Sequence, residues 1–587
     1  MRCLILQLDL GVPFGILAGG HLGKLMVITR NEDLAVGDIF LIPSTRGEPR
    51  YFIFRVSNFE NIVRRLGSIE TVAETLVVEK DAYLANLEEE KLMAVEGTLL
   101  GYGKYSDKDK KFVFKKARRL PEHFSGIYKV QKVDNEDALR DILASQLSGD
   151  IYIGDLLVGE ESLSIDVMIP KGKVPMHIGI FGATGSGKSN LMQVITKSFI
   201  DYNLNCHING LKDRITLLTI DPHDEYALGT GEFGIQDIVD EIDSRSSEVR
   251  REIFGDFYYL TTSIDATPRK VQRYAKKIKV SLQEILPIDL MSIHQFTPPQ
   301  IAYMSTLHAV YRDEWINNVG DPQGFMDATV KAVERYLAFL KRSNIFHDGY
   351  TGSNLLDIVS ALEKGRVLLF NTSLTSQREQ FLSTTIIART IFELRKAVKS
   401  SNALDILKKQ IATRDISECI RKDFLQKNLI QEFYLKDQNT VKDTSELVPI
   451  LITVEEAPSI LTPDLMRFEG NVYKAISRQG RKFGIGLAVI SQQVSSINPS
   501  LLSQLNTQIV LALGNADEIR FAIRAASRDI ADFESEFKVL DRGEAVLTAS
   551  YRDLPFVVRV PLFDDRFKKD SMKYTTIKSA KEPEIIL

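Results

Sequence analysis

A glycine-rich loop between an apolar run and a helical stretch constrains this 587-residue chain more than any other feature. The loop reads GATGSGKS over residues 182–189, and a short apolar run, residues 177–181, precedes it. Apolar residues at spacings of three and four follow the loop, which predicts a helix. The order of strand, loop and helix around the spacing G-x-x-x-x-G-K-S is typical of a phosphate-binding P-loop. A chance match is the alternative, and the flanking pattern argues against it.

Each residue type in the loop has a chemical reason to be there. Glycines let the backbone curl so that its N–H groups point at phosphate oxygens, and the following helix adds partial positive charge at its N-terminus. We expect Lys188 to contact the β- and γ-phosphates and Ser189 to bind Mg²⁺, so that the cofactors are ATP and Mg²⁺. The predicted nucleotide-binding residues are Gly182, Ala183, Thr184, Gly185, Ser186, Gly187, Lys188, Ser189 and Asn190.

The chain after the loop alternates between strand-like and helix-like runs. Several strand-like runs are continuously apolar, which is typical of a parallel sheet covered on both faces. The fold class predicted is therefore α/β. The runs that predict strands are 214–226, which ends in acids, 365–373, 448–457, 484–493, 507–513, 543–550 and 555–560.

Composition shifts predict three parts of the chain. Residues 1–155 carry short β-branched and aromatic runs between Gly, Asp and Asn, which favours a small β-barrel. Residues 156–562 form the nucleotide-binding domain. It carries a helical insertion at about 232–345 and a charged, weakly patterned surface insertion at about 397–446. Residues 563–587 are a charged C-terminal extension, and we expect them to be extended.

Composition excludes little beyond a membrane protein. No run of 18 or more apolar residues occurs, so no membrane partner is expected. Cys3, Cys206 and Cys419 lie far apart and form no metal or disulfide pattern, which favours a cytoplasmic protein. The formal charge of −4 neither supports nor excludes nucleic acid as a partner, because a ring needs positive charge only on its inner surface.

Paired carboxylates end one of the apolar runs. In the stretch PILITVEEA, Glu455 is predicted to hold the magnesium shell and Glu456 to polarise the attacking water. Two solvated acids at a strand end are the alternative. Asp221 also ends an apolar run and is the rival for the magnesium role, although only the later site has two adjacent carboxylates.

Two further side chains have the chemistry to assist phosphoryl transfer. Gln492 ends the run GIGLAVISQQ and is predicted to lie near the γ-phosphate. Arg481 lies in the preceding stretch SRQGRKFG, between Arg478 and Lys482, and a guanidinium can stabilise charge on the transferring phosphoryl group when a neighbouring subunit supplies it. A solvated basic helix end is the alternative, and spacing alone favours it.

These blocks, in their order, resemble the HerA/FtsK branch of P-loop motors, and HerA more than FtsK. The similar stretches are VPMHIGIFGATGSGKSN, LLTIDPHDEY, ITVEEA, the region from EGNVYKAISRQGRKFG to LNTQIVLAL, and RGEAVLTASYRDLPFVVRV. Together they cover about residues 150–560. Three positions depart from the family pattern: Asp224 stands where glycine is usual, Glu455 where aspartate is commoner, and Pro458 where histidine is frequent.

The resemblance implies a RecA-like core with a helical insertion, preceded by a small N-terminal β-barrel domain and assembled as a homo-hexamer around duplex DNA. Carried over residue by residue, it makes Glu455 and Glu456 the Walker B pair, Gln492 the sensor and Arg481 the arginine finger. The catalytic residues expected are therefore Lys188, Glu456, Arg481 and Gln492.

Two functions are compatible with these residues. In the first, ATP hydrolysis by a helicase-type translocase drives duplex DNA through the ring toward a partner nuclease similar to NurA. In the second, the ring is an NTP-dependent scaffold that assembles and activates an effector of antiphage defence, either a nuclease or a sirtuin-type NAD hydrolase. The sequence leaves both open, because the partner is encoded elsewhere.

Overall fold

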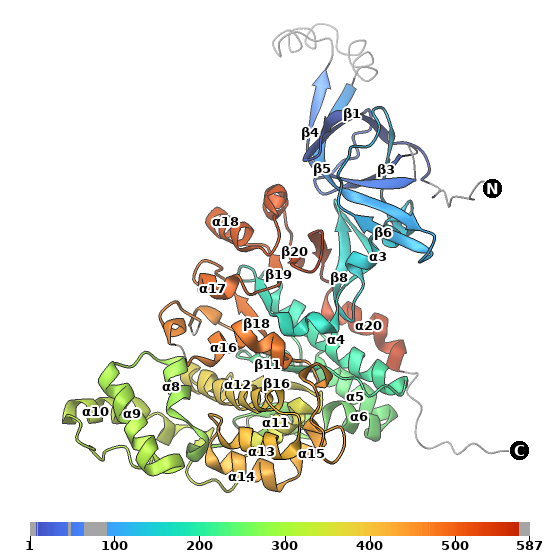
Figure 1. Ribbon diagram of the computed structural model, residues 1–587. Helices are drawn as coiled ribbons and strands as arrows, with labels where there is room; N and C mark the ends of the chain where they lie inside the picture. The colour runs from blue at the N-terminus through green and yellow to red at the C-terminus, as the bar shows by residue number, and fades with distance from the viewer. Residues whose placement is uncertain are drawn as a thin grey trace, which may run out of the picture. The chain divides into compact units, whose positions relative to one another are not determined.

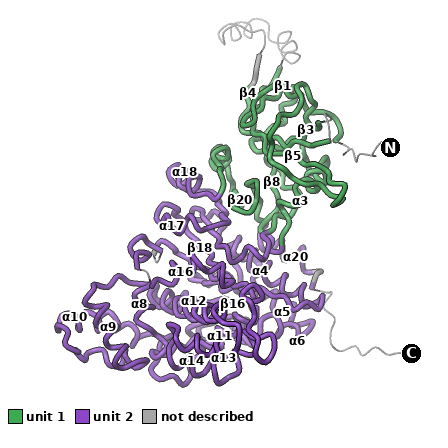
Figure 2. The backbone as a smooth tube through the Cα atoms, in the orientation of Figure 1, with its two compact units in different colours: residues 1–149, 153–168, 528–560 green, residues 150–152, 169–527, 561–587 purple. Residues whose placement is uncertain are grey.

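The computed structural model describes residues 8, 10–44, 49–63, 91–459, 461–468 and 470–574. Two compact units share the chain (Figure 2). Unit 1 comprises residues 1–149, 153–168 and 528–560, and unit 2 comprises residues 150–152, 169–527 and 561–587. Neither unit is one continuous stretch, so segments far apart in the sequence fold together in each.

A closed antiparallel barrel forms the first part of unit 1 (Figure 1). Its strands pair in the order β2-β1-β7-β3-β4-β5, and β5 pairs back to β2, which closes the barrel; β6 adds to β5. Buried side chains such as Phe40, Phe52 and Phe54 fill its interior. The barrel expected from the sequence is therefore confirmed. Its strands are β1 (Gly15–His21), β2 (Lys24–Thr29), β3 (Ile39–Ser44), β4 (Arg50–Val63), β5 (Lys91–Ser106), β6 (Lys111–Lys115) and β7 (Gly126–Lys129).

The rest of unit 1 includes a segment from late in the sequence. Arg55 on β4 forms a buried ion pair with Glu536, and its guanidinium lies 3.8 Å from the ring centroid of Phe533. Burial lowers the pKa of Arg55 to about 9, and the charge of Asp532 opposes this shift. The remaining elements are α3 (Glu136–Leu147), β8 (Ile151–Val158), β9 (Glu161–Ile169), α19 (Glu534–Phe537), β20 (Glu544–Ala549) and β21 (Phe556–Arg559), with strand order β20-β21-β8-β9.

Unit 2 is built on a parallel sheet with the order β13-β12-β16-β11-β17-β18-β10-β19. Its central strands are buried along their whole length, which explains their continuous apolar runs. The expected parallel sheet is confirmed. The strands are β10 (Ile178–Phe181), β11 (Thr216–Asp221), β12 (Tyr259–Thr261), β13 (Ala275–Lys277), β16 (Val367–Asn371), β17 (Ile450–Val454), β18 (Ile485–Ser491) and β19 (Thr507–Leu511), beside a separate pair, β14 (Val280–Ser281) and β15 (Phe346–His347).

Helices cover this sheet (Figure 1). Nearly all residues of α12 from Gln380 to Val398 are buried. In the described part of the chain, no helix combines the length and apolarity needed to cross a membrane. The helices are α4 (Lys188–Ile208), α5 (Ile235–Arg245), α6 (Ser247–Phe254), α7 (Arg269–Gln272), α8 (Pro287–Ile293), α9 (Pro298–Tyr311), α10 (Asp327–Leu337), α11 (Leu355–Glu363), α12 (Gln377–Lys399), α13 (Leu404–Ala412), α14 (Glu418–Gln426), α15 (Leu429–Tyr434), α16 (Val472–Gln479), α17 (Pro499–Leu502), α18 (Ala516–Ala525) and α20 (Phe563–Tyr574).

Three segments differ from their sequence patterns. Residues 259–261, inside the stretch expected to be helical, form β12 and extend the sheet. Residues 397–446 contain the short helices α13, α14 and α15, whose apolar residues are buried. The expectation of an extended chain after residue 562 is wrong for residues 563–574, which form α20 and bury Phe563, Phe567 and Tyr574; residues 575–587 lie outside the described part of the chain.

Candidate active site

The chemistry-bearing side chains gather at one edge of the parallel sheet of unit 2. Parallel strands present their carboxyl ends at the same edge, and Phe181 at the end of β10 pairs with Ser491 at the end of β18. The glycine-rich loop follows β10, Asp221 ends β11, Glu455 follows β17 and Gln492 follows β18. The structure therefore brings together four elements that the sequence separates by up to 310 positions.

The stem of the glycine-rich loop is fixed between two strand ends. The backbone N–H of Gly182 donates to the carbonyl of Ser491 (3.3 Å), and that of Ala183 donates to the carbonyl of Ala512 (2.8 Å). Lys188 Nζ donates to the carbonyls of Gly182 and Ala183, at 2.8 Å each, so the ammonium is folded back into its own loop. Burial lowers the pKa of Lys188, and the charge of Glu455 opposes this shift.

The N-terminus of α4 is left open for an anion. Gly187 precedes the helix with φ 108°, no side chain caps the helix, and its first turn contains no acidic residue. Its first N–H groups therefore remain available, together with the partial positive charge of the helix dipole. A Cβ at Gly182 would lie 2.5 Å from Ser186 Oγ and 3.0 Å from Leu511 Cβ, so a larger residue there would displace the loop or its neighbour.

Asn190 has a structural contact in addition to its place in the motif. Its Nδ2 donates to the carbonyl of Pro561 (2.9 Å), and its Oδ1 accepts from the backbone N–H of Phe563 (2.9 Å). The side chain thus holds the segment that leads into α20 against the start of α4. The Oδ1 of Asn190 and one of its two Nδ2–H groups are therefore engaged in a structural contact.

Glu455 lies beside a tyrosine that the sequence analysis did not assign. The hydroxyl of Tyr226 donates to Glu455 Oε1. Burial raises the pKa of Glu455 to about 8; the Tyr226 hydrogen bond lowers it, and the charges of Asp221, Glu225 and Glu456 raise it further. A carboxylate in such an environment gains stability from a nearby cation.

The side chains present fit a magnesium ion, whose preferred ligands are oxygens. The half-buried Ser189 hydroxyl at the start of α4 and the Glu455 carboxylate are the groups that would hold it. When bound, magnesium neutralises charge on the phosphates. A cation bound beside Glu455 would stabilise its ionised form and so lower the pKa that burial raises.

Asp221 is engaged by its own loop. Its Oδ1 accepts from the backbone N–H groups of His223 (3.3 Å) and Glu225 (3.0 Å), and its Oδ2 accepts from that of Tyr226 (2.9 Å). Burial raises the pKa of Asp221 to about 6, and these three hydrogen bonds oppose the shift. Both carboxylate oxygens therefore shape the turn after β11.

The same turn accounts for one departure from the family pattern. Asp224 has φ 58°, in the left-handed region where glycine is unstrained and where aspartate is one of the better-tolerated substitutes. The hydroxyl of Tyr259 donates to Asp224 Oδ1 (2.6 Å), and Asn371 Nδ2 donates to the Tyr259 hydroxyl (2.5 Å). These contacts hold a side chain that glycine would lack.

Glu456 is exposed and has φ 50°, which is also in the left-handed region. Its Oε2 accepts from Nε2 of Gln377, the first residue of α12, at 2.9 Å. Strained backbone of this kind gathers at functional sites. On the same side of the sheet, Thr184 Oγ1 in the glycine-rich loop donates to Gln492 Oε1 at 2.8 Å. The predicted sensor thus contacts the loop directly.

Arg481 is not brought to this edge. It lies exposed on the 3-10 helix η8 (Gly480–Phe483), which precedes β18, whereas Gln492 follows that strand. The seven residues of β18, at about 3.3 Å each, put roughly 20 Å between the two ends of the strand. Arg481 and Lys188 of one chain therefore lie at opposite edges of the sheet.

Sequence reasoning missed two residues that touch the site. Tyr226 is the last residue of the block DPHDEY, five positions after Asp221. An aspartate that ends a strand often caps the turn that follows, and this signal would have predicted that Tyr226 lies beside the end of the strand. Gln377 is 79 positions from Glu456, and nothing in the sequence pattern pairs the two.

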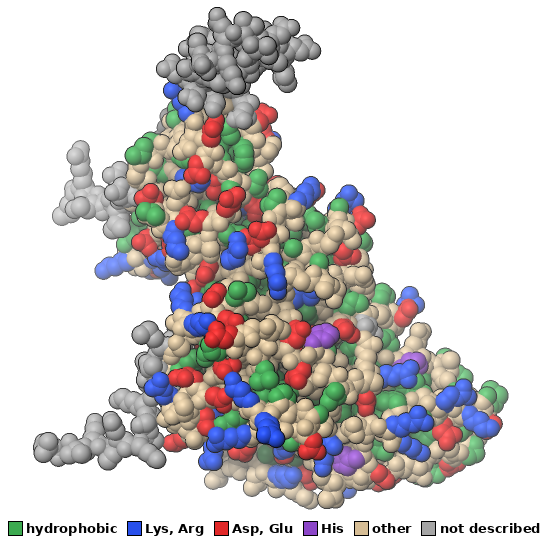
Figure 3. Space-filling model, turned by 180° about the vertical axis from the view of Figure 1, so that it is seen from behind, with side chains coloured by type: hydrophobic (Ala, Val, Ile, Leu, Met, Phe, Trp, Pro, Cys, Tyr) green, Lys and Arg blue, Asp and Glu red, His purple; other side chains and the backbone are tan. Residues whose placement is uncertain are grey.

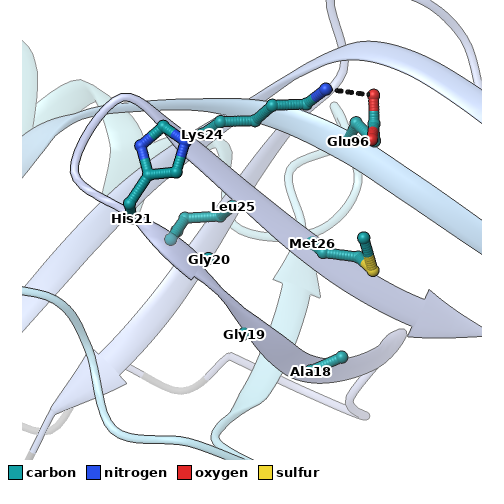
Figure 4. A pocket seen from close by; sticks show the side chains of 8 residues that line it. All are labelled: Ala18, Gly19, Gly20, His21, Lys24, Leu25, Met26 and Glu96. Atoms are coloured by element: carbon teal, nitrogen blue, oxygen red, sulfur yellow. Dashed lines mark ion pairs between the residues drawn. The ribbon is translucent and has the colours of Figure 1, made fainter.

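A separate hollow lies on the barrel (Figure 4). Its volume is about 230 Å³, and Lys24 pairs with Glu96 across its rim at 2.6 Å. The lining residues are Ala18, Gly19, Gly20, His21, Lys24, Leu25, Met26 and Glu96. Glu96 is the one acid among these lining residues, so we assign the chemistry to the sheet edge of unit 2, where several carboxylates lie beside the glycine-rich loop.

On the face drawn in Figure 3, Lys and Arg side chains are interspersed with Asp and Glu. This view therefore shows no broad surface of a single sign, in keeping with the formal charge of −4. Electrostatic recognition of a polyanion would have to use a localised surface rather than the net charge.

The part of the chain that is similar to known proteins includes the glycine-rich loop and Asp221. Residues 151–407 match a family model described as the central domain of the helicase HerA. The chain is 26% identical over 431 residues to the DNA double-strand break repair helicase HerA of Pyrococcus furiosus, which covers 71% of this chain and 70% of that one. It is 22% identical over 448 residues to HerA of Sulfolobus acidocaldarius, which covers 75% of each.

Solved structures similar to this chain include VirB4 of Thermoanaerobacter pseudethanolicus, with a TM-score of 0.39 and 12% identity, over 70% of this chain and 97% of that one. The plasmid coupling protein TrwB in complex with ADP and Mg²⁺ has a TM-score of 0.38 and 13% identity, over 68% and 87% of the two chains.

Proposed function

We propose that this chain, which matches the HerA central-domain model over residues 151–407, hydrolyses ATP to drive duplex DNA through a ring of identical subunits. The observation that carries the proposal is the shared sheet edge, where the glycine-rich loop, Glu455, Glu456 and Gln492 meet. The named relatives are DNA helicases, which supports DNA as the substrate.

Each residue has one role in the proposed reaction. The loop of residues 182–189 and the N-terminus of α4 bind the phosphates, and Lys188 leaves its loop carbonyls to contact them. Ser189 and Glu455 hold the magnesium ion. Glu456 accepts a proton from the attacking water, and Gln492 orients the γ-phosphate through its contact with the loop.

We assign magnesium to Glu455 rather than to Asp221. The turn after β11 already uses both oxygens of Asp221, whereas Glu455 has one neutral hydrogen-bond donor and several like charges around it. A cation is therefore favoured beside Glu455. The Glu455 side chain, which is one methylene longer than that of the commoner aspartate, reaches the Tyr226 hydroxyl.

The position of Arg481 supports a ring. An arginine finger must reach the γ-phosphate, and the Arg481 of one chain lies about 20 Å from its own site by the length of β18. A neighbouring subunit that packs its η8 edge against the carboxyl edge of this sheet would bring the two together. We propose a homo-hexamer, in which six chains of 66.2 kDa total about 400 kDa.

The proposed partner outside the ring is a nuclease that receives the moving DNA. The alternative is a ring that assembles and activates an effector enzyme with little translocation. The decisive difference is whether DNA is coupled to turnover, since the scaffold has no need for such coupling.

The test is the ATPase rate of the full-length protein with and without linear duplex DNA over a range of salt concentrations. DNA should raise turnover, and added salt should remove the effect steeply, because phosphate contacts release counterions. Lys188→Ala should be inactive at every salt concentration. A parental rate in Lys188→Ala would refute the nucleotide site. An inactive Lys188→Ala beside a parent that ignores DNA would instead favour the scaffold.

A further inference from the structure

A fully buried guanidinium lies between the strand that leads to the paired acids and the turn that carries Arg481. Arg395 on α12 has no exposed side-chain surface. Its Nε and Nη2 donate to the two carboxylate oxygens of Glu363 on α11, at 3.0 and 2.8 Å. This bidentate pair compensates the charge, without which a buried guanidinium would be strongly unfavourable.

The other N–H bonds of Arg395 hold two separate backbone segments. Nη2 also donates to the carbonyl of Val448 (2.8 Å), two residues before β17. Nη1 donates to the carbonyls of Phe483 (3.0 Å) and Gly484 (3.2 Å), where η8 ends and β18 is about to begin. All five N–H donors are therefore used, and the planar fork fixes both segments at once.

The two segments lead to different residues of the proposed active sites. Val448 leads into β17, and β17 leads to Glu455 and Glu456. Phe483 and Gly484 close the turn that presents Arg481. A further backbone bond, from the Ile450 N–H to the Gly484 carbonyl (2.9 Å), joins the same segments. A displacement of the guanidinium would thus shift the acids and the finger relative to each other.

The helical segment at residues 397–446 also reaches this contact. Tyr434, at the end of α15, is fully buried and donates its hydroxyl to Glu363 Oε1 at 2.9 Å. Glu363 Oε1 therefore accepts from both Tyr434 and Arg395. The segment that the sequence marks only as a charged insertion supplies one support of the Arg395 site.

We infer that Arg395 is a positioning residue that sets Arg481 relative to the strand of Glu455 and Glu456, and that Tyr434 holds Arg395 in place. The inference rests on the proposed function, in which Arg481 serves the neighbouring subunit. Glu456 and Arg481 of one chain then act in two different active sites. Arg395 is the contact through which one chain fixes the spacing between those two sites.

The first variant is Arg395→Lys, which keeps the charge but loses the planar fork and at least two of the five donors. Misplacement of the finger turn should lower kcat by about 10- to 100-fold. The KM for ATP should stay within about twofold of the parent, because Arg395 does not touch the glycine-rich loop and the effect falls on the transition state.

The matched control lies six residues earlier on the same helix. Arg389 is also buried and paired, with Asp289 at 2.5 Å and with the carbonyls of Asp415 (2.7 Å) and Glu284 (3.1 Å). These partners belong to the helical part of unit 2 rather than to the segments around β17 and η8. Arg389→Lys should therefore keep a kcat within about threefold of the parent once the rings are assembled.

A double-mutant cycle separates positioning from general damage. Strand β17 is paired on both sides, to β11 and β18, so the displacement should fall on the turn that carries Arg481. On an Arg481→Ala background, Arg395→Lys should therefore add less than about a twofold loss, because the side chain that the turn positions is already gone. If Arg395→Lys instead caused a general structural defect, the fold losses in kcat of the two single variants would multiply in the double variant. Single-turnover hydrolysis of labelled ATP gives the sensitivity that the slow variants require. If Arg395→Lys does not assemble, Tyr434→Phe, which removes one hydroxyl, goes through the same cycle.

The outcomes distinguish this inference from the function on which it rests. A parental rate in Arg481→Ala would refute the proposed finger. A slow Arg481→Ala beside a parental Arg395→Lys, or multiplied losses in the double variant, would refute only the inference. A loss of kcat in Arg389→Lys as large as that in Arg395→Lys would also refute it.

Discussion

Two carboxylates that look alike in the sequence differ in their surroundings. Asp221 accepts three backbone N–H groups from the turn after β11, whereas Glu456 is exposed and accepts from Gln377. The first arrangement stabilises a loop. The second leaves a carboxylate oxygen free to take a proton from water, as a general base requires.

We predict that Glu456→Gln lowers ATP turnover by about 10² to 10⁴-fold, the usual contribution of a general base, while ATP still binds. The amide keeps the size of the side chain but accepts a proton poorly. Asp221→Asn should instead lower the stability of the turn and reduce turnover by a smaller factor. Steady-state ATPase and nucleotide-binding measurements on both variants test this. If Asp221→Asn abolishes turnover and Glu456→Gln does not, the acids are assigned to the wrong strand.

His177 connects the loop strand to its neighbour. It has φ 60°, is buried, and its Nδ1 accepts from the backbone N–H of Leu487 at 3.0 Å. Burial lowers its pKa to about 4, and a hydrogen bond with the backbone of Ser477 opposes this shift. The folded chain therefore keeps this imidazole neutral at pH values where an unfolded chain protonates it.

This difference predicts a loss of stability in acid. Between pH 6.5 and about 4 the unfolded chain binds a proton at His177 that the folded chain does not, so stability falls as pH falls through that window. The full effect is about 3 kcal/mol. Asn accepts a hydrogen bond and tolerates positive φ, so His177→Asn should flatten the pH dependence of the urea midpoint. An unchanged slope in that variant would show that other groups cause the acid sensitivity.

At the residue scale, the sequence could predict what a local motif specifies. The glycines and Lys188 follow from a fixed spacing, and the structure places them around one loop. Contacts such as Tyr226 with Glu455 and Gln377 with Glu456 join residues 229 and 79 positions apart, and no local periodicity encodes them. They depend on which strands lie side by side, which only the folded sheet decides.

At the element scale, α20 is fastened to the helix that follows the glycine-rich loop. Lys197 on α4 is buried and pairs with Asp201 on its own helix (2.6 Å) and with Asp570 on α20 (2.9 Å). Arg566 also pairs with Asp570 at 2.9 Å. The C-terminal helix thus helps to hold α4 in place.

We predict that Asp570→Ala destabilises unit 2 by about 2–4 kcal/mol, because the buried Lys197 keeps only Asp201 as a carboxylate partner. Hydrogen exchange in α20 should quicken, and the thermal midpoint should fall. Asp565 is exposed on the same helix, and Asp565→Ala is the matched control, expected to stay within about 0.5 kcal/mol of the parent. Equal effects of the two substitutions would show that the buried ion pair contributes little.

Elements were predicted well where their residues are buried on both sides. The runs of β10, β17 and β18 are apolar along their length, and each forms a central strand. The short helices α13 to α15 bury only a few residues each, so their apolar pattern is weak in a charged stretch. Helix α20 was not predicted for the same reason, because its few buried aromatic residues are surrounded in the sequence by Lys, Arg and Asp.

At the scale of the whole molecule, the proposed ring divides one catalytic set between two chains. Lys188, Glu456 and Gln492 belong to one sheet edge, and Arg481 lies at the other. A defect at one edge can therefore be complemented by a subunit with a defect at the opposite edge. A single-chain active site would show no such rescue.

We predict that Arg481→Ala and Glu456→Gln, each inactive alone, recover activity when mixed before assembly. In a random mixture of equal parts, about a quarter of the interfaces combine an intact Glu456 with an intact Arg481 from the neighbour. ATPase without DNA should approach that fraction of the parent if sites fire independently. Mixing after assembly is the control and should recover nothing. No recovery in either case, with rings confirmed by mass, would place the finger elsewhere, and Arg478 is the next residue to test.

The composite make-up of unit 1 has a consequence for how the protein is made. Arg55 is buried in the barrel, and its ion-pair partner Glu536 comes 481 positions later in the chain. A ribosome adds about 5–20 residues per second, so on the order of a minute passes between the synthesis of the two. During that time the nascent barrel contains a guanidinium without its carboxylate. The N-terminal part is therefore the first to be translated and among the last to be completed.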